Sequence, residues 1–109
     1  MDTSSRVSNV FLAFAQEAPK HHKAWMDAVV QLDSACALDK KTEALAYIAV
    51  MAVMRLESGI PFHVKHAKSL GATREEIISA ILVGLPAAGN VVVSSLPAAL
   101  QAFDDKQHS

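Results

Sequence analysis

Cysteine, aromatic residues and charges of either sign are all scarce in this chain of 109 residues. The single cysteine, Cys36, excludes an internal disulfide framework and is typical of proteins kept in a reducing compartment. Ten basic and eleven acidic residues leave a formal charge of −1, and no run of lysine or arginine offers nucleic acid an electrostatic contact. We therefore expect a cytoplasmic protein with no nucleic-acid partner.

We also expect no hydrophobic run long enough to span a membrane. We take Ala44 to Leu56 as the longest nearly uncharged apolar stretch, and it ends at Arg55 and Glu57, well short of the ~18 residues that a membrane span needs. The N-terminal segment is interrupted by polar residues and does not resemble a signal peptide. The sequence thus predicts no membrane partner.

Apolar residues, in contrast, are plentiful. They make up 51% of the chain and charged residues only 19%, so the chain is more apolar than most soluble domains. A chain of this length folds as one domain, residues 1–109, and buries only about two-thirds of the surface that its unfolded form exposes. We expect the apolar excess to form an interface between copies of the chain, which makes the protein a homo-oligomer.

Apolar residues recur at helical spacing almost throughout, and strand patterns are nearly absent. The spacing predicts an all-α single domain of about six helices joined by short connections. The first predicted helix carries an apolar stripe of Val7, Val10, Phe11 and Phe14, and the second begins at Pro19. The third runs from Lys40 to Glu57 and the fourth from Pro61 to Leu70. The fifth runs from Thr73 to about Pro86, and the sixth from Asn90 to about Asp104.

Several helix ends carry recognisable signals. Asp39 is a good N-cap for the third helix, and Thr73 with Glu76 three residues later forms a capping box for the fifth. Gly71 suits the position just past the end of the fourth helix. Pro97 is expected to bend or interrupt the sixth helix, because proline cannot donate a backbone hydrogen bond.

The second and third helices are expected to bury much of their surface. The third is apolar nearly all round, so in so short a chain its far side is expected to meet another subunit. In the second helix the predicted buried face consists of Trp25, Val29 and Leu32 with Met26 and Val30.

Four segments in register give the chain a family resemblance. They read L-D-K-K-T-E-A-L-A at 38–46, F-H-V-K-H-A at 62–67, L-G-A-T-R-E-E-I at 70–77 and L-P-A-A-L at 96–100. In this order they resemble the helix opening, histidine helix, glycine turn and closing segment of the carboxymuconolactone decarboxylase/alkylhydroperoxidase D superfamily, with the match strongest over 38–103. The resemblance implies that superfamily's helical bundle and its assembly into trimers or hexamers.

The peroxidase branch of that superfamily carries Cys-x-x-Cys, a histidine four residues later and a glutamate near the start of the preceding helix. In ungapped register the histidine falls on His63, the cysteines on Leu56 and Gly59, and the glutamate on Ala44. Dithiol chemistry needs one thiolate to attack and a second thiol to resolve. A peroxiredoxin-like or alkylhydroperoxidase-like function is therefore disfavoured, and the chain is closer to the decarboxylase branch, which also lacks the cysteines and keeps the histidine.

His63 is the leading candidate for a catalytic residue. Imidazole titrates near neutral pH and both accepts and donates protons, and decarboxylation of a lactone acid needs a donor for the carbanion that carbon dioxide leaves behind. The candidate set is completed by His66 three residues later, by Glu57, and by Glu43 at the start of the third helix. A histidine hydrogen-bonded in a subunit interface and two carboxylates with surface roles are the alternative interpretation.

The leading functional hypothesis is lyase-type acid/base chemistry on a small carboxylate or lactone, in a pocket around His63 that a neighbouring subunit closes. A non-catalytic oligomeric binding or accessory protein is the alternative, because only one of the four chemical groups of the peroxidase branch remains. A metal shared by His63, His66 and Glu57, and a one-cysteine redox centre at Cys36, are less favoured. We expect no cofactor and no metal.

Overall fold

The computed structural model describes the backbone of residues 3–106 and the side chains of residues 9–106. All regular structure in this part of the chain is helical, which confirms the all-α prediction. Val7 of the predicted first stripe lies outside the described side chains. The elements are α1 (Thr3–Glu17), α2 (Pro19–Ala35), α3 (Lys40–Met54), the 3-10 turn η1 (Glu57–Gly59), α4 (Ile60–Ser69), α5 (Arg74–Leu82), α6 (Leu85–Ala88), the 3-10 segment η2 (Gly89–Ser95) and α7 (Leu96–Asp104).

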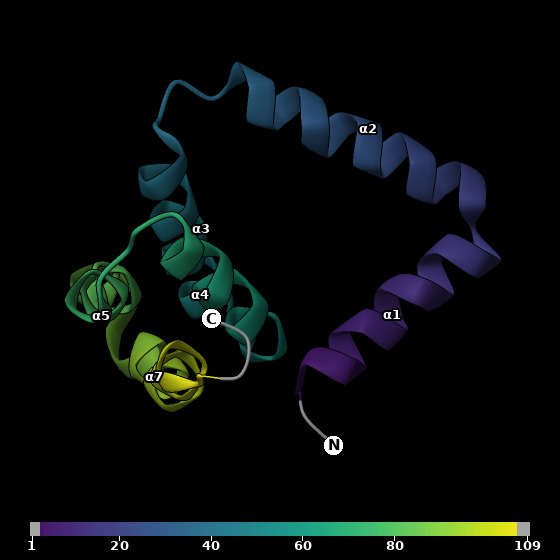
Figure 1. Ribbon diagram of the computed structural model, residues 1–109. Coiled ribbons are helices and arrows are strands. Elements are labelled where there is room, and N and C mark those ends of the chain that lie inside the picture. The colour runs from purple at the N-terminus through teal and green to yellow at the C-terminus, as the bar shows by residue number, and fades with distance from the viewer. Residues whose placement is uncertain (1–2, 107–109) are drawn as a thin grey trace.

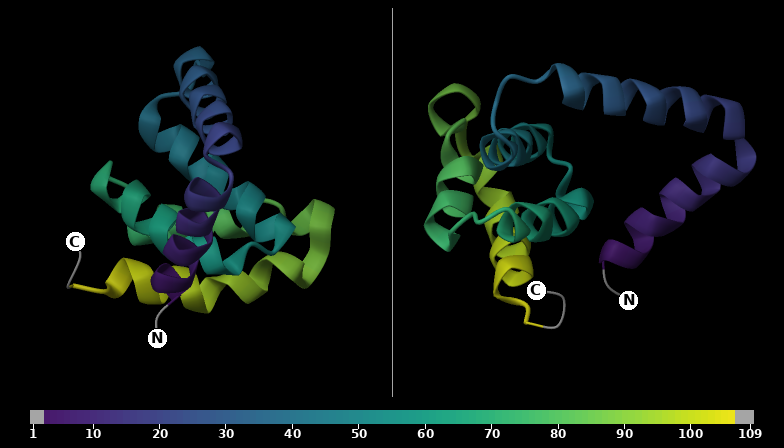
Figure 2. Two further views of the ribbon diagram at one scale, coloured as in Figure 1. Left: turned by 90° about the vertical axis from the view of Figure 1, so that its right-hand side faces the viewer. Right: turned by 45° about the horizontal axis from the view of Figure 1, so that its top comes forward.

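The hydrophobic core lies between α3, α4, α5 and α7, with η2 closing one side. In Figure 1, α3 and α4 stand between the α5–α7 pair and the first two helices, and the second view of Figure 2 shows the same order. The core is aliphatic, because aromatic residues are few and mostly lie elsewhere. Its fully buried larger apolar side chains are Ile48, Ile60, Val64, Ile77, Ile81 and Val92.

The two predicted N-terminal caps are confirmed. The backbone N–H of Thr42 donates to the carboxylate of Asp39 at 2.8 Å, so Asp39 caps α3. Thr73 and Glu76 form both hydrogen bonds of the capping box at the start of α5. Gly71, which follows α4, has φ of +98°, a backbone conformation that a residue with a Cβ adopts only at a cost.

The third helix is shorter than predicted. It ends at Met54 rather than at Glu57, because Arg55 turns the chain out of the helix with φ of +61° in the left-handed region. The N–H of Leu56 then bonds to the carbonyl of Met51 and closes the turn. The residues predicted as the last helical positions therefore form the connection to α4, and Glu57 begins η1.

The predicted sixth helix is divided. Residues 85–104 form α6, η2 and α7 in place of one helix from Asn90, and Gly89 with φ of +78° separates the first two. Pro97 lies in the first turn of α7, where its missing N–H breaks no intrahelical bond, so it starts a helix instead of bending one.

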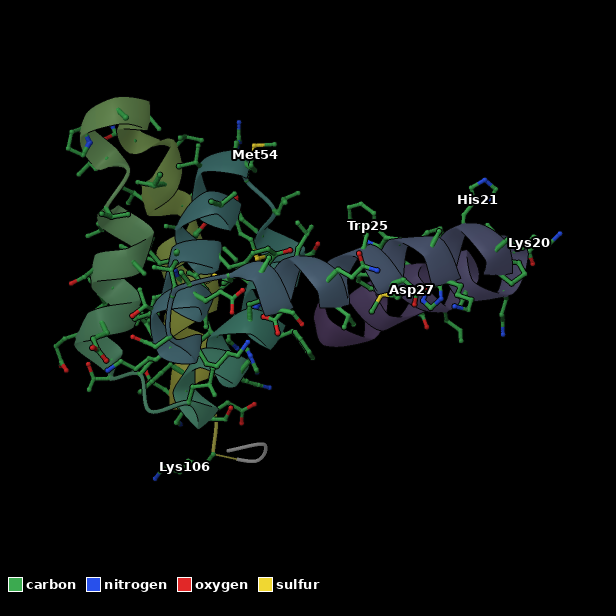
Figure 3. All side chains as sticks on the ribbon, turned by 90° about the horizontal axis from the view of Figure 1, so that it is seen from above. Lys20, His21, Trp25, Asp27, Met54 and Lys106 are labelled. Carbon is green, nitrogen blue, oxygen red and sulfur yellow. The ribbon has the colours of Figure 1, made fainter. Side chains whose placement is uncertain are left out.

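The first two helices form an arm, residues 3–35, that stands away from the bundle (Figures 1 and 3). The prediction that α2 buries its apolar face was wrong for the single chain, because none of residues 19–35 is buried. The physical reason is that α2 packs chiefly against α1, and α1 in turn packs chiefly against η1 and α4. The five residues of the predicted face are all exposed: Trp25, Met26, Val29, Val30 and Leu32.

The prediction about the longest uncharged stretch was also wrong. No charged residue occurs between Glu76 and Asp104, and the helical run Arg74–Asp104, of 31 residues, is long and apolar enough by these two criteria to cross a membrane. Sequence reasoning passed over this run because glycine and proline divide it. In the structure α5 and α7 pack against each other and against α3 and α4, so the run folds back within the bundle rather than forming one straight helix.

Candidate functional site

The candidate site is built on the antiparallel pair α3 and α4. Their packing requires close approach at the turn, since a methyl group on Gly59 would lie 2.7 Å from Cε of Met51. One helical turn further from the connection, the rings of Tyr47 and His63 face each other with centroids 4.7 Å apart. The two helices therefore bring a residue from the middle of α3 onto the candidate histidine of α4.

His63 is half-buried between two aromatic rings. Tyr47 lies on one side at an interplanar angle of 49°, and Phe62 lies edge-on at 82° with its centroid 5.1 Å away. Within the described part of the chain, no hydrogen bond engages either ring nitrogen of His63. Because the ring is only half-buried, its nitrogens remain accessible to solvent or to a ligand.

The environment of His63 favours the neutral imidazole. Burial lowers the pKa of His63 below its ordinary value of 6.5, because a charged ring would lose hydration, and the positive charge of His66 lowers it further. His63 and His66, three residues apart on α4, therefore influence each other through repulsion between their positive charges. At neutral pH His63 rests in the uncharged form.

The hydrogen-bond partner of Glu57 is Ser94 rather than His63. Its Oε2 lies 3.1 Å from Oγ of Ser94, and the same hydroxyl lies 2.9 Å from the carbonyl oxygen of Val91. Because a serine hydroxyl has one proton, it donates to one of these acceptors at a time. Glu57 thereby links η1 to η2.

Glu43 and His66 lie in a polar cluster near the start of α3. Nζ of Lys40 lies 2.8 Å from Asp33 and 3.7 Å from Glu43, so the lysine joins the end of α2 to α3. Hydrogen bonding to Lys40, then to Glu43, with a smaller attraction from His66, holds the pKa of Asp33 below its ordinary value. The structure thus places Glu43 and His66 in one cluster and His63 with its aromatic neighbours beside it.

Within the described part of the chain, no hydrogen bond or ion pair joins the four predicted site residues to one another. Among residues 3–106, no group of three or more histidine, cysteine, aspartate or glutamate side chains is arranged to hold a metal ion. Sequence reasoning missed Tyr47 and Phe62, the two residues that contact His63. Pairing α3 and α4 as a helical hairpin would have found Tyr47, because it stands as far before the turn as His63 stands after it.

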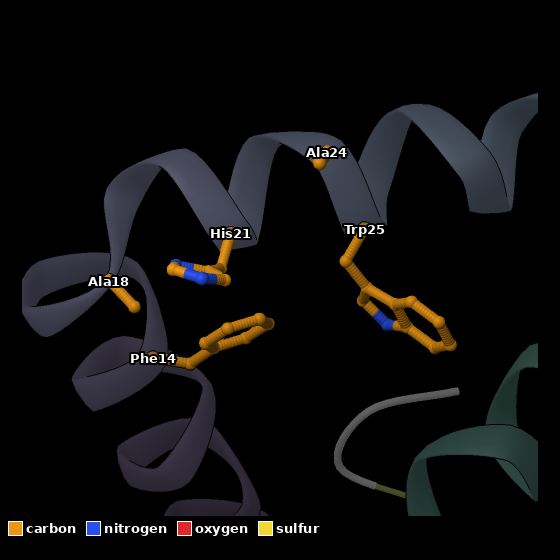
Figure 4. A pocket seen from close by; sticks show the side chains of 5 residues that line it. All are labelled: Phe14, Ala18, His21, Ala24 and Trp25. Carbon is orange, nitrogen blue, oxygen red and sulfur yellow. The ribbon is translucent and has the colours of Figure 1, made fainter.

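A surface hollow lies in the arm, away from His63. It is open and apolar, and it is lined by Phe14 and Ala18 near the α1–α2 corner and by side chains along α2 (Figure 4). None of the residues that line this hollow is one of the four predicted site residues. Its α2 lining residues are His21, Ala24 and Trp25.

These features define an all-α domain with a packed four-helix core, a projecting helical arm and a half-buried histidine on the second helix of an antiparallel pair. The sequence profile of the Carboxymuconolactone decarboxylase family matches residues 19–104, and the chain therefore belongs to this family. The match includes α2 as well as the bundle. It confirms the resemblance carried by the four sequence segments.

A solved structure shares the fold. It is the apo form of a carboxymuconolactone decarboxylase family protein from Legionella pneumophila, with a TM-score of 0.81 and 24% sequence identity over 94% of this chain and 91% of that chain. At this identity the similarity shows a common fold, arm included. No curated protein matches the sequence.

Proposed function

We propose that the protein carries out lyase-type acid/base chemistry on a small carboxylate or lactone, with His63 as the proton donor and acceptor. The observation that supports this proposal most directly is the packing of the imidazole between Tyr47 and Phe62 with no hydrogen bond to its nitrogens from the described residues. A ring fixed in orientation, with free nitrogens and a lowered pKa, suits proton transfer.

The proposed step is protonation of carbon after loss of carbon dioxide. The bond between the ring carbon and the carboxylate carbon of a lactone acid breaks, and its electron pair stays on the ring as an enolate. The imidazolium form of His63 donates its proton to that carbon, and water reprotonates the imidazole before the next turnover. Because the pKa of His63 is lowered, its imidazolium form is a stronger acid than an exposed one.

The test is the variant His63→Gln assayed with a carboxylated γ-lactone, with carbon dioxide release as the measurement. We expect loss of about two or more orders of magnitude in kcat/KM, the range that positioned acid/base groups contribute, while the oligomer mass and helix content stay unchanged. His66→Gln serves as the control on the same helix and is expected to keep most activity. Turnover by His63→Gln equal to that of the wild type would refute the proposal.

A second function is favoured by one observation, the contacts that Glu57 and Glu43 make with residues other than His63. Among the described residues no carboxylate hydrogen-bonds to the imidazole, whereas many histidine acid/base catalysts have such a partner. This favours a non-catalytic oligomeric binding or accessory protein. A carboxylated γ-lactone that binds in calorimetry but releases no carbon dioxide with the wild type would support this alternative.

A further inference from the structure

The single tyrosine of the chain packs on the candidate histidine. Tyr47 lies in the middle of α3, and its ring centroid is 4.7 Å from that of His63 on α4. Phe62 contacts the same imidazole with a wholly apolar ring, so packing of this kind does not require a hydroxyl group. The phenol oxygen of Tyr47 is therefore the part of the contact that packing leaves unexplained.

The hydroxyl of Tyr47 makes no hydrogen bond to another described residue, and the same holds for the two ring nitrogens of His63. The tyrosine side chain is 52% exposed and the histidine is half-buried, so a bound molecule can reach both. Two neighbouring polar groups, one from each helix of the pair, thus remain free to contact a ligand.

The carboxylates that the sequence suggested for this site have other partners. Glu57 bonds to Ser94, and Glu43 lies 3.7 Å from Nζ of Lys40. Of the two rings that contact the imidazole, only that of Tyr47 carries a polar atom. A group that assists His63 from within its own packing contacts is therefore the phenol.

We propose that the hydroxyl of Tyr47 donates a hydrogen bond to the carbonyl oxygen of a carboxylated lactone and stabilises the enolate that forms when carbon dioxide leaves. This inference rests on the proposed function, because it adds a second catalytic residue to the same site. The electron pair of the broken carbon–carbon bond moves toward the carbonyl oxygen, where Tyr47 meets the negative charge. The phenol keeps its proton, and His63 supplies the proton that the carbon receives.

The position of the phenol suits this role. A donor that is already held in place is most effective where charge develops in the transition state, because no reorganisation is needed when the charge appears. Contact with the imidazole at an interplanar angle of 49° holds the tyrosine ring relative to His63. With ring centroids 4.7 Å apart, a small lactone can contact a nitrogen of His63 and the phenol oxygen together.

The first experiment measures the binding of tetronate by calorimetry. Tetronate is a five-membered lactone that exists as a stable enolate at neutral pH, so it resembles the intermediate and needs no turnover. Tyr47→Phe removes the hydroxyl and keeps the ring. We expect it to raise the dissociation constant for tetronate at least about 10-fold, the effect of losing one hydrogen bond to a charged group.

Two controls accompany this measurement. Ser69→Ala removes a hydroxyl that bonds to the carbonyl of His66 at the end of α4, and it is expected to keep the wild-type affinity. The NMR titration of His63 in Tyr47→Phe should match that of the wild type, because the aromatic ring still covers the imidazole. A matching titration shows that the variant has kept the local packing.

The second experiment measures carbon dioxide release from a carboxylated γ-lactone. We expect kcat of Tyr47→Phe to fall about 100-fold or more, the usual effect of removing one donor to a developing oxyanion. KM should change much less, because the carbonyl oxygen carries little charge before the carbon–carbon bond breaks.

The outcomes separate this inference from the proposed function. Tetronate affinity in Tyr47→Phe equal to that of the wild type, or a wild type that does not bind tetronate, overturns the role of Tyr47. If His63→Gln loses turnover while Tyr47→Phe keeps the wild-type kcat, the proposed function stands and the role of Tyr47 is overturned. A wild type that binds tetronate through Tyr47 but releases no carbon dioxide overturns the proposed function and leaves Tyr47 as an enolate-binding residue.

Discussion

Tyr47, Phe62 and His63 form a small aromatic group at the junction of α3 and α4. The sequence predicted the histidine, because its register in a family motif marks it, but it did not predict the two rings. Contacts across a helical hairpin depend on how the turn is formed, and here Arg55 in the left-handed region ends α3 earlier than the apolar pattern suggests. The chemical group was thus predictable, and its environment was not.

Substitution of the residues next to His63 tests the cause of its lowered pKa. Replacing Tyr47 or Phe62 with alanine removes part of the apolar cover of the imidazole, so the pKa of His63 is expected to rise toward 6.5. Histidine NMR titration gives the value. His66→Gln is expected to raise it as well, by removing a neighbouring cation. A pKa that falls in the alanine variants would contradict burial as the main cause.

The same shift predicts how stability depends on pH. The folded-state pKa of His63 lies below its unfolded value, so the unfolded chain binds a proton first as the pH falls. The contribution of His63 is present above pH 6.5 and is lost as the pH drops from 6.5 through the folded-state pKa. Urea unfolding at pH 7.5 and at pH 5 should therefore show a smaller loss of stability for His63→Gln than for the wild type.

At the scale of single elements, capping signals were the most reliable part of the sequence. The capping box of α5 formed as predicted because both of its hydrogen bonds are local and need no tertiary contact. Thr73→Ala is expected to lower the free energy of unfolding by about 1 kcal/mol, as loss of an N-cap usually does. Thr73→Ser keeps the hydroxyl and should stay close to the wild type in the same denaturation curve.

The end of α3 offers a stabilising change. Arg55 holds φ of +61°, and a residue with a Cβ adopts this conformation less readily than glycine. Arg55→Gly is expected to raise the free energy of unfolding by about 0.5–1 kcal/mol, the usual gain at a left-handed position after a helix, less the added entropy of the unfolded chain. Arg55→Ala is the control and should give no such gain.

At the scale of the whole molecule, the all-α class and the family followed from sequence, and the position of the arm did not. The apolar face of α2 was recognised, but periodicity identifies a face without identifying what covers it. In the single chain this face meets no core, so the same pattern that predicts burial produces exposure. To predict what covers a helix, one must know which surfaces remain exposed after the bundle has formed.

We propose that a second copy covers the exposed apolar face of α2, a contact that would link folding to concentration. We expect the melting temperature of the wild type to rise with protein concentration over a hundredfold range, because dissociation accompanies unfolding. The arm variant Trp25→Glu/Leu32→Glu should melt lower and independently of concentration. A wild-type melting temperature that is constant over this range would contradict the coupling.

The uncharged segment between Glu76 and Asp104 has a consequence for the synthesis of this protein. A nascent helix of that length and hydropathy is a substrate for the machinery that inserts proteins into lipid bilayers. Gly84, Pro86, Gly89 and Pro97 divide it into pieces that fold onto helices already made. We expect replacement of these four residues with leucine to send part of the product to the membrane fraction.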